Sequence, residues 1–133
     1  MPFISLLYFR TAVVFLLVGI VMGLHMAATH DHSTLAAHAH VNLLGWVTPA
    51  LFAGYFALNP AQAERWLAKL QYAVYVSGVA LMGPMLYLML RGRPELEPVV
   101  VFSSLLVFAG AILFAVIAFT SPARVALPRV AAE

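Results

Sequence analysis

Long stretches without charged residues divide the chain into apolar segments. No Asp, Glu, Lys or Arg occurs between Arg10 and Asp31, and comparable runs follow along the rest of the chain. Each run reaches the roughly 20 residues that a helix needs to cross the hydrocarbon core of a bilayer. The runs do not alternate polar and apolar residues, so strands of a membrane barrel are not expected. The pattern predicts membrane-spanning helices at about residues 8–29, 40–58, 69–90 and 98–120.

The segments between these runs are short, so we expect one all-α integral membrane domain, an up-down bundle of four transmembrane helices over residues 1–123. Residues 124–133 are expected to form a cytoplasmic tail. The first apolar run is longer than the core of a signal peptide and lacks a clean cleavage pattern, which predicts a retained helix. Pro49 and Pro84 lie inside predicted spans, where proline usually kinks a helix without ending it.

Composition strengthens the membrane assignment. Of the 133 residues, 64% are hydrophobic and 9% are charged, whereas soluble domains carry about 25% charged residues. The expected partner is therefore the lipid bilayer. The absence of cysteine excludes disulfides, thiolate zinc sites and thiol catalysis. A net charge of +2 without a basic run gives no reason to expect nucleic-acid binding.

The distribution of Lys and Arg predicts the orientation of the bundle, because these residues are enriched in cytoplasmic loops. The side with both termini holds the larger basic group, and the other side holds only Arg91 and Arg93. We therefore expect both termini in the cytoplasm; in a Gram-negative bacterium the bundle would then lie in the inner membrane with the histidine segment toward the periplasm. The larger basic group consists of Arg10, Arg65, Lys69, Arg124 and Arg129.

All 5 histidines fall between residues 25 and 40, on the side that this orientation turns toward the periplasm. His25 lies near the outer end of span 1, His30 and His32 lie in the connecting loop, and His38 and His40 lie at the start of span 2. Histidine inside a span usually marks a function, and neutral imidazole is the commonest metal ligand. The alternative interpretation is that the loop histidines are simply solvated and that His25 hydrogen-bonds a neighbouring carbonyl.

The spacing of His38 and His40 constrains what they can bind together. Residues two apart on an α-helix differ by about 200° around its axis, so the rings point to opposite faces. A zinc site on one helix uses spacings of three or four residues. The spacing therefore favours two separate ligands that flank the helix, although an unwound helix start would let both rings share one ion.

The stretch "HAHVNLLGWVTPALFAGYFAL" resembles the tenth helix of subunit I in the haem–copper oxidase superfamily. The wider pattern "GLHMAA…DHS…HAHVNLLGW" resembles small four-helix bacterial membrane proteins related to that subunit. The resemblance implies that His38 is the axial ligand of a high-spin haem and that His40 ligates a low-spin haem. It also implies that Arg91 and Arg93, in "RGRP", pair with haem propionates; the alternative is that they cap a helix end among the headgroups.

The resemblance also implies an architecture. Subunit I of this superfamily has twelve helices in three arcs of four, and this chain is similar to one arc. Three copies would supply twelve helices, so the resemblance implies a homo-oligomer, a trimer being the matching number. Gly19 and Gly23 form a GxxxG pattern, which predicts close helix packing within the chain or between subunits.

The chain departs from the oxidase pattern at the copper site and at the proton channels. It has no adjacent histidine pair and no histidine followed four residues later by tyrosine. No carboxylate or lysine lies between the predicted span ends. A proton-pumping oxidase is therefore not expected, and the sequence leaves open whether the chain is an enzyme, as an oxidoreductase-like haem protein would be.

Three functions remain as hypotheses. The first is binding of haem b for electron transfer or for a diatomic gas such as O2 or NO, with His38, His40 and His25 as axial ligands. Its partner would be an electron donor protein or a quinol. The second is copper or zinc binding or sensing at the periplasmic face, using all the histidines, His30 and His32 included. The third is a cofactor-free accessory subunit of a respiratory complex.

Overall fold

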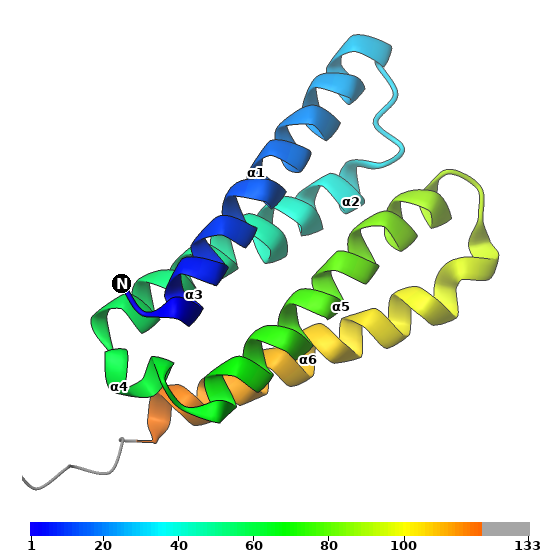
Figure 1. Ribbon diagram of the computed structural model, residues 1–133. Coiled ribbons are helices and arrows are strands. Elements are labelled where there is room, and N and C mark those ends of the chain that lie inside the picture. Colours follow the sequence, from blue (N-terminus) through cyan, green and yellow to red (C-terminus); the bar gives the residue numbers. More distant parts are fainter. Residues whose placement is uncertain (121–133) are drawn as a thin grey trace, which may run out of the picture.

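In the computed structural model, which describes residues 1–120, the chain folds as two antiparallel helical hairpins that lie against each other (Figure 1). The first hairpin is α1 followed by a long rod made of α2, η1 and α3, and the second is α5 followed by α6. The predicted tail 124–133, with Arg124 and Arg129, lies outside the described residues. The elements are α1 (Phe3–Thr29), α2 (Leu35–His40), η1 (Val41–Val47), α3 (Thr48–Leu58), α4 (Pro60–Ala63), α5 (Trp66–Leu90), η2 (Pro94–Leu96) and α6 (Glu97–Phe119).

The four predicted spans are confirmed as helices long and apolar enough to cross a membrane. Each begins a few residues before its predicted start, because the prediction placed the start where polarity falls. Lys69 and Glu97 lie inside helices. Charged residues therefore mark where the apolar part of each helix begins, and the helix itself starts a few residues earlier. The four spans are Phe3–Thr29, Leu35–Leu58, Trp66–Leu90 and Pro94–Phe119.

Neither internal proline ends its span, as predicted. Pro84 lies within the continuous helix α5. Pro49 lies two residues after the end of the π-helical segment η1, where the Thr48 backbone N–H donates to the carbonyl of Leu43, five residues back. Proline has no N–H, and its ring clashes with the carbonyl four residues earlier, so a locally widened helix accommodates it. Span 2 therefore changes its helical period immediately after His40.

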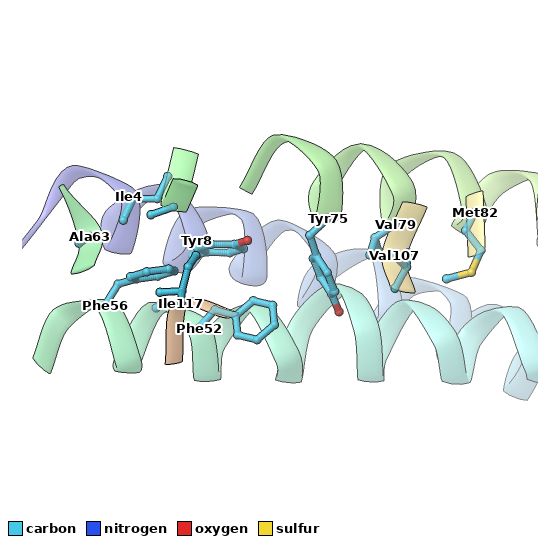
Figure 2. Close-up of a cluster of buried hydrophobic side chains, with 12 residues drawn as sticks. Ile4, Tyr8, Phe52, Phe56, Ala63, Tyr75, Val79, Met82, Val107 and Ile117 are labelled. Carbon is cyan, nitrogen blue, oxygen red and sulfur yellow. The ribbon is translucent and has the colours of Figure 1, made fainter. Parts of the chain in front are cut away.

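The hydrophobic core joins all four spans and extends from the end of the bundle that holds α4 past the middle of α5, to Met82 (Figure 2). The Tyr8 ring of α1 meets the Phe52 ring of α3 edge to face, with centroids 5.4 Å apart. Phe52 in turn stacks on Phe114 of α6, with centroids 4.0 Å apart, and meets Tyr75 of α5 at 5.1 Å. Edge-to-face and offset arrangements such as these are the favourable geometries for aromatic pairs. The aromatic cluster thus fixes the end of the bundle opposite the histidines.

Buried polar side chains connect the helices across this core. The Tyr8 hydroxyl donates to Gln71 Oε1 over 2.6 Å, and Gln71 Nε2 donates to the carbonyl of Gly110 over 3.2 Å. Gln71 therefore links α1, α5 and α6. Ser5 Oγ donates to the carbonyl of Ala53, 2.7 Å away, and so links α1 to α3. Such bonds satisfy polar groups that would otherwise be stranded away from water.

Glycines allow close approach along two seams. A Cβ added at Gly110 of α6 would lie 2.7 Å from the Cβ of Tyr75 in α5. A Cβ added at Gly19 of α1 would overlap Oδ1 of Asn42 in η1. The GxxxG pattern of α1 therefore packs within the chain, against span 2, which decides between the two alternatives left by the sequence.

The outer faces of the spans are apolar and exposed, as a lipid-facing surface requires. Leu17 of α1 is 58% exposed, Leu51 of α3 is 67% exposed and Phe108 of α6 is 64% exposed. Extensive exposed apolar surface is rare on soluble monomers. The structure thus agrees with a protein whose expected partner is the lipid bilayer.

Candidate functional site

The histidines gather at the end of the bundle where α1 turns into α2. His25 lies four residues before the end of α1, and His40 lies five residues after the start of α2. Gly23 of α1 lies opposite His38 and Gly19 lies opposite Asn42, so His40 is level with about residue 21 of α1, about 6 Å farther from the loop than His25. His30 and His32 are exposed in the loop between the helices, where His30 ends α1 in the left-handed conformation.

His38 and His40 occupy different faces of α2, as their spacing predicts. The His38 ring is half-buried and turns toward α1: a Cβ added at Gly23 would lie 3.2 Å from its Cε1. The His40 ring is exposed and lines a different surface. The structure therefore separates the two rings that the resemblance treats as haem ligands.

His38 belongs to a polar seam inside the first hairpin. Asn42 Nδ2 donates to the His38 backbone carbonyl over 2.9 Å and lies 3.3 Å from the ring Nδ1. The Asn42 amide in turn fills the space over Gly19, one helical turn from Gly23. His38 is thus held between α1 and η1, and His40 is the ring of the pair that faces outward.

The His40 ring has a defined orientation. Its Nδ1 lies 2.7 Å from the backbone carbonyl oxygen of Ala36. A carbonyl only accepts hydrogen bonds, so Nδ1 carries the proton and, in the neutral ring, Nε2 holds a lone pair. Metal-bound histidines show the same arrangement, in which the second ring nitrogen donates to a carbonyl and so fixes the tautomer. His40 is therefore prepared to donate Nε2 to a metal.

The surface around His40 is apolar. The ring lines a hollow of about 250 Å³ together with Ala39, Leu43 and Leu44. An unpaired ring nitrogen among such neighbours is costly at a lipid-facing surface. The hollow accordingly suits the apolar face of a cofactor whose metal would take the nitrogen.

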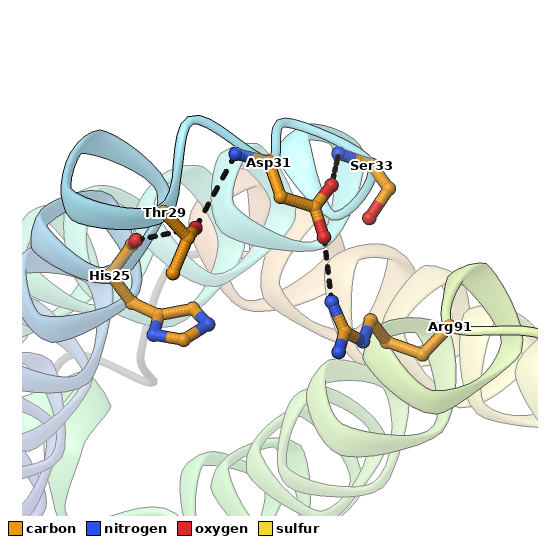
Figure 3. A network of polar contacts seen from close by, with 5 residues as sticks. All are labelled: His25, Thr29, Asp31, Ser33 and Arg91. Carbon is orange, nitrogen blue, oxygen red and sulfur yellow. Dashed lines mark hydrogen bonds and ion pairs between the residues drawn. The ribbon is translucent and has the colours of Figure 1, made fainter.

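His25 lines a second hollow, between α1 and α5. This hollow, about 220 Å³ in volume, is also lined by Val21, Met22 and Tyr87. Met22 and Tyr87 also line an adjoining, wholly apolar groove of about 310 Å³, which reaches Val41 of η1. The His25 ring itself is exposed, and its backbone carbonyl accepts the hydroxyl of Thr29 over 2.8 Å (Figure 3).

The two arginines predicted beside the histidines lie at this same end, and each pairs with a carboxylate. Arg91 Nη1 lies 2.7 Å from Asp31 Oδ2, an ion pair that connects the α1–α2 loop to the end of α5 (Figure 3). Arg93 pairs with Glu95, two residues away. The backbone N–H and hydroxyl of Ser33, followed by the charge of Arg91, hold the pKa of the Asp31 carboxyl below its usual value.

The histidines do not converge on one point within a single chain. Among residues 1–120, no three side chains of the His, Cys, Asp or Glu type come close enough together to hold a metal ion. The opposite directions of the rings account for this: His38 turns to the seam with α1, while His40 faces outward.

The sequence identified the histidines but not the groups that orient them. The Ala36 carbonyl lies four residues before His40 and is a backbone atom that any residue would supply. Asn42 could have been recognised from the sequence, because it is the only residue with an amide side chain in span 2 and lies one helical turn after His38. Tyr87, beside His25, becomes evident only when α1 and α5 are placed side by side.

Comparison of the chain with known protein families, with characterised proteins and with solved structures finds no match.

Proposed function

We propose that this protein binds haem b at the histidine end of the bundle, with His40 as an axial ligand of the iron. The observation that carries the proposal is the hydrogen bond from His40 Nδ1 to the Ala36 carbonyl, which leaves Nε2 as a lone pair at an exposed apolar surface. No other histidine ring among residues 1–120 donates to a backbone carbonyl.

The donor set around His40 fits the chemistry of a haem. A haem takes one or two imidazole ligands, an apolar lining for its macrocycle and cations for its propionates. His40 offers the imidazole, and Leu43 and Leu44 offer the apolar lining. Arg91 and Arg93 are exposed at the same end and already hold carboxylates, which are chemically equivalent to propionates. A guanidinium binds such groups in a fork and can exchange one carboxylate for another.

When bound, the haem would supply one-electron chemistry or an open coordination position for O2 or NO. The protein contributes the ligand and its orientation. The Ala36 carbonyl makes the His40 ring more electron-rich through its hydrogen bond, and Leu43 and Leu44 give the hollow beside the ring an apolar lining. The number of imidazoles on the iron would decide the function: two favour electron transfer, whereas one leaves a position for a gas.

The competing hypothesis of a copper or zinc site requires several donors around one ion. Within residues 1–120 the chain assembles no such group by itself. His30 and His32, which an ion site would recruit, are exposed in the loop. Because the histidine rings do not gather around one point, the structure favours a cofactor that takes a single imidazole from one surface of the chain over an ion that needs several.

The test is the haem content of the purified protein, measured as the pyridine haemochromogen, in wild type and in His40→Gly. We expect His40→Gly to lose most of the haem and to regain it when imidazole is added to the growth medium or to the purified protein, because free imidazole can replace the missing ring. His32→Gly is the matched control, since His32 lies in the nearby loop, and it should retain haem at the wild-type level. Equal haem content in wild type and His40→Gly would refute the assignment of His40.

A further inference from the structure

The site around His40 is incomplete within one chain. Its hollow of about 250 Å³ is bounded by a single short stretch of helix, Ala39 to Leu44. Cofactor sites usually enclose most of their ligand, and a haem is larger than this hollow. A second surface must therefore cover the other face of the cofactor, and in a membrane that surface is either lipid or protein.

The other exposed imidazole that lies on a helix at this end of the bundle is His25. Its hollow, lined by Met22 and Tyr87, is separate from that of His40 and shares no residue with it. The adjoining groove reaches Val41, on the α5-facing side of span 2, whereas Leu43 lines the His40 hollow. Residues two apart on a helix point in nearly opposite directions. The two hollows therefore open on different sides of the bundle, and His25 and His40 of one chain cannot meet on one iron.

Two copies in the same orientation can bring these rings together. Rotation about an axis along the membrane normal preserves depth. The backbones of His25 and His40 differ in depth by about 6 Å, but side chains tilt toward the N-terminus of their own helix, and in the antiparallel α1 and span 2 this brings the two rings toward a common level. The His40 face of one copy can therefore meet the His25 face of its neighbour at one level. Because the two faces differ, the contact is head-to-tail and closes only as a ring, for which three copies is the smallest number.

We propose that the haem lies between copies of this chain, with His40 of one copy and His25 of the next as its two axial ligands. This inference rests on the proposed function. It gives the exposed imidazole of His40 a partner surface in place of lipid, and it places Arg91, which is paired with Asp31 in the loop after α1, beside the same interface. Two imidazoles on the iron assign the protein to electron transfer, because no coordination position is left for a gas.

The test is complementation between two variants that each lack one ligand. His25→Ala with one affinity tag and His40→Ala with another are co-expressed, and mixed oligomers are isolated by purification on both tags in succession. Each variant alone should bind little haem. A mixed ring of three contains one interface at which an intact His40 meets an intact His25, so about one third of the wild-type haem per chain should return.

The matched control is a mixture of His25→Ala with the double variant His25→Ala/His40→Ala, which contains no intact His25 and should stay without haem. If wild type binds haem but the first mixture recovers none, or if His25→Ala alone keeps its haem, the shared site is refuted while the haem proposal stands. A monomeric haem-containing wild type in detergent would refute the shared site in the same way. A wild type without haem would refute the proposed function itself.

Discussion

Hydrogen bonds to the backbone give His38 and His40 different roles, although only one residue separates them. Asn42 bonds to the His38 carbonyl and holds that residue in the seam with α1. The Ala36 carbonyl holds the His40 ring at the outer surface. A histidine becomes a candidate ligand when one ring nitrogen is occupied and the other is free, and of these two only His40 has a ring nitrogen bonded to a backbone carbonyl.

Gln71 offers a test of the buried polar links. Its side chain is fully buried and joins the Tyr8 hydroxyl to the Gly110 carbonyl. Gln71→Leu would leave the hydroxyl without its acceptor, and we expect the free energy of unfolding to fall by about 1–2 kcal/mol. The measurement is unfolding in detergent with increasing dodecyl sulfate, followed by circular dichroism.

The matched control for Gln71→Leu is Ser77→Ala on the same helix, because Ser77 is exposed and bonds only to the carbonyl of Val74 within its own turn. This variant should unfold within about 0.5 kcal/mol of wild type. Equal stability of Gln71→Leu and Ser77→Ala would show that the buried link is not stabilising.

At the scale of helices, glycine determines which pairs approach closely. Gly78 and Gly110 allow α5 and α6 to approach closely, and Gly19 and Gly45 do the same for α1 and η1. The second seam places Asn42 against α1 and, through it, His38. The π-helical segment that follows His40 accommodates Pro49 and keeps span 2 continuous. The orientation of the histidines is thus set by elements on both sides of them.

Gly110→Ala should destabilise the bundle. The new Cβ would lie 2.7 Å from the Cβ and 2.8 Å from the Cα of Tyr75, atoms that cannot move without moving α5. We expect a loss of about 1–3 kcal/mol in the same unfolding experiment. Gly54→Ala is the control: nothing lies within 4 Å of its new Cβ, so the higher helix propensity of alanine should leave stability equal or slightly increased. If both variants behave alike, close approach of α5 and α6 is not what holds this seam.

At the scale of the whole molecule, the two hairpins are joined differently at their two ends. The aromatic cluster and Gln71 join them at the end with α4. The Asp31–Arg91 ion pair joins them at the histidine end, where both side chains are about half exposed. Exposed ion pairs contribute little to global stability. We therefore expect the histidine end to be the part of the molecule where the hairpins separate most easily.

Acid should loosen the histidine end. The pKa of Asp31 is lowered in the fold, so its ion pair stabilises the folded arrangement above the ordinary pKa of an aspartate and is lost as the pH falls through the lowered value. Because the chain has no cysteine, spin labels can be placed at Ala27→Cys and Glu97→Cys. The distance distribution between them should be narrow at pH 7 and widen below about pH 4.

The variant Asp31→Asn controls for this effect, because it cannot titrate at position 31. Its distance distribution should already be wide at pH 7 and should change little with acid, while its melting temperature stays near that of wild type. A distribution in Asp31→Asn that is as narrow as in wild type would show that the ion pair does not hold the hairpins together.

The spans could be predicted from the sequence because a membrane-crossing helix is specified locally, by about 20 apolar residues in succession. The opposite faces of His38 and His40 could be predicted because they follow from the helix period alone. The contact of His38 with Gly23, the hollow shared by His25 and Tyr87, and the pairing of Arg91 with Asp31 could not be predicted. Each depends on how distant helices pack, and an apolar sequence carries few local signals for that packing.

The measurement that tests the central claim most directly is the absorption spectrum of wild-type protein purified from haem-replete cells, recorded as isolated and after reduction. The account predicts a Soret band that shifts on reduction, with haem visible bands typical of imidazole ligation, and the loss of these features in His40→Gly. A colourless wild-type preparation would contradict the account, as would an unchanged haem spectrum in His40→Gly.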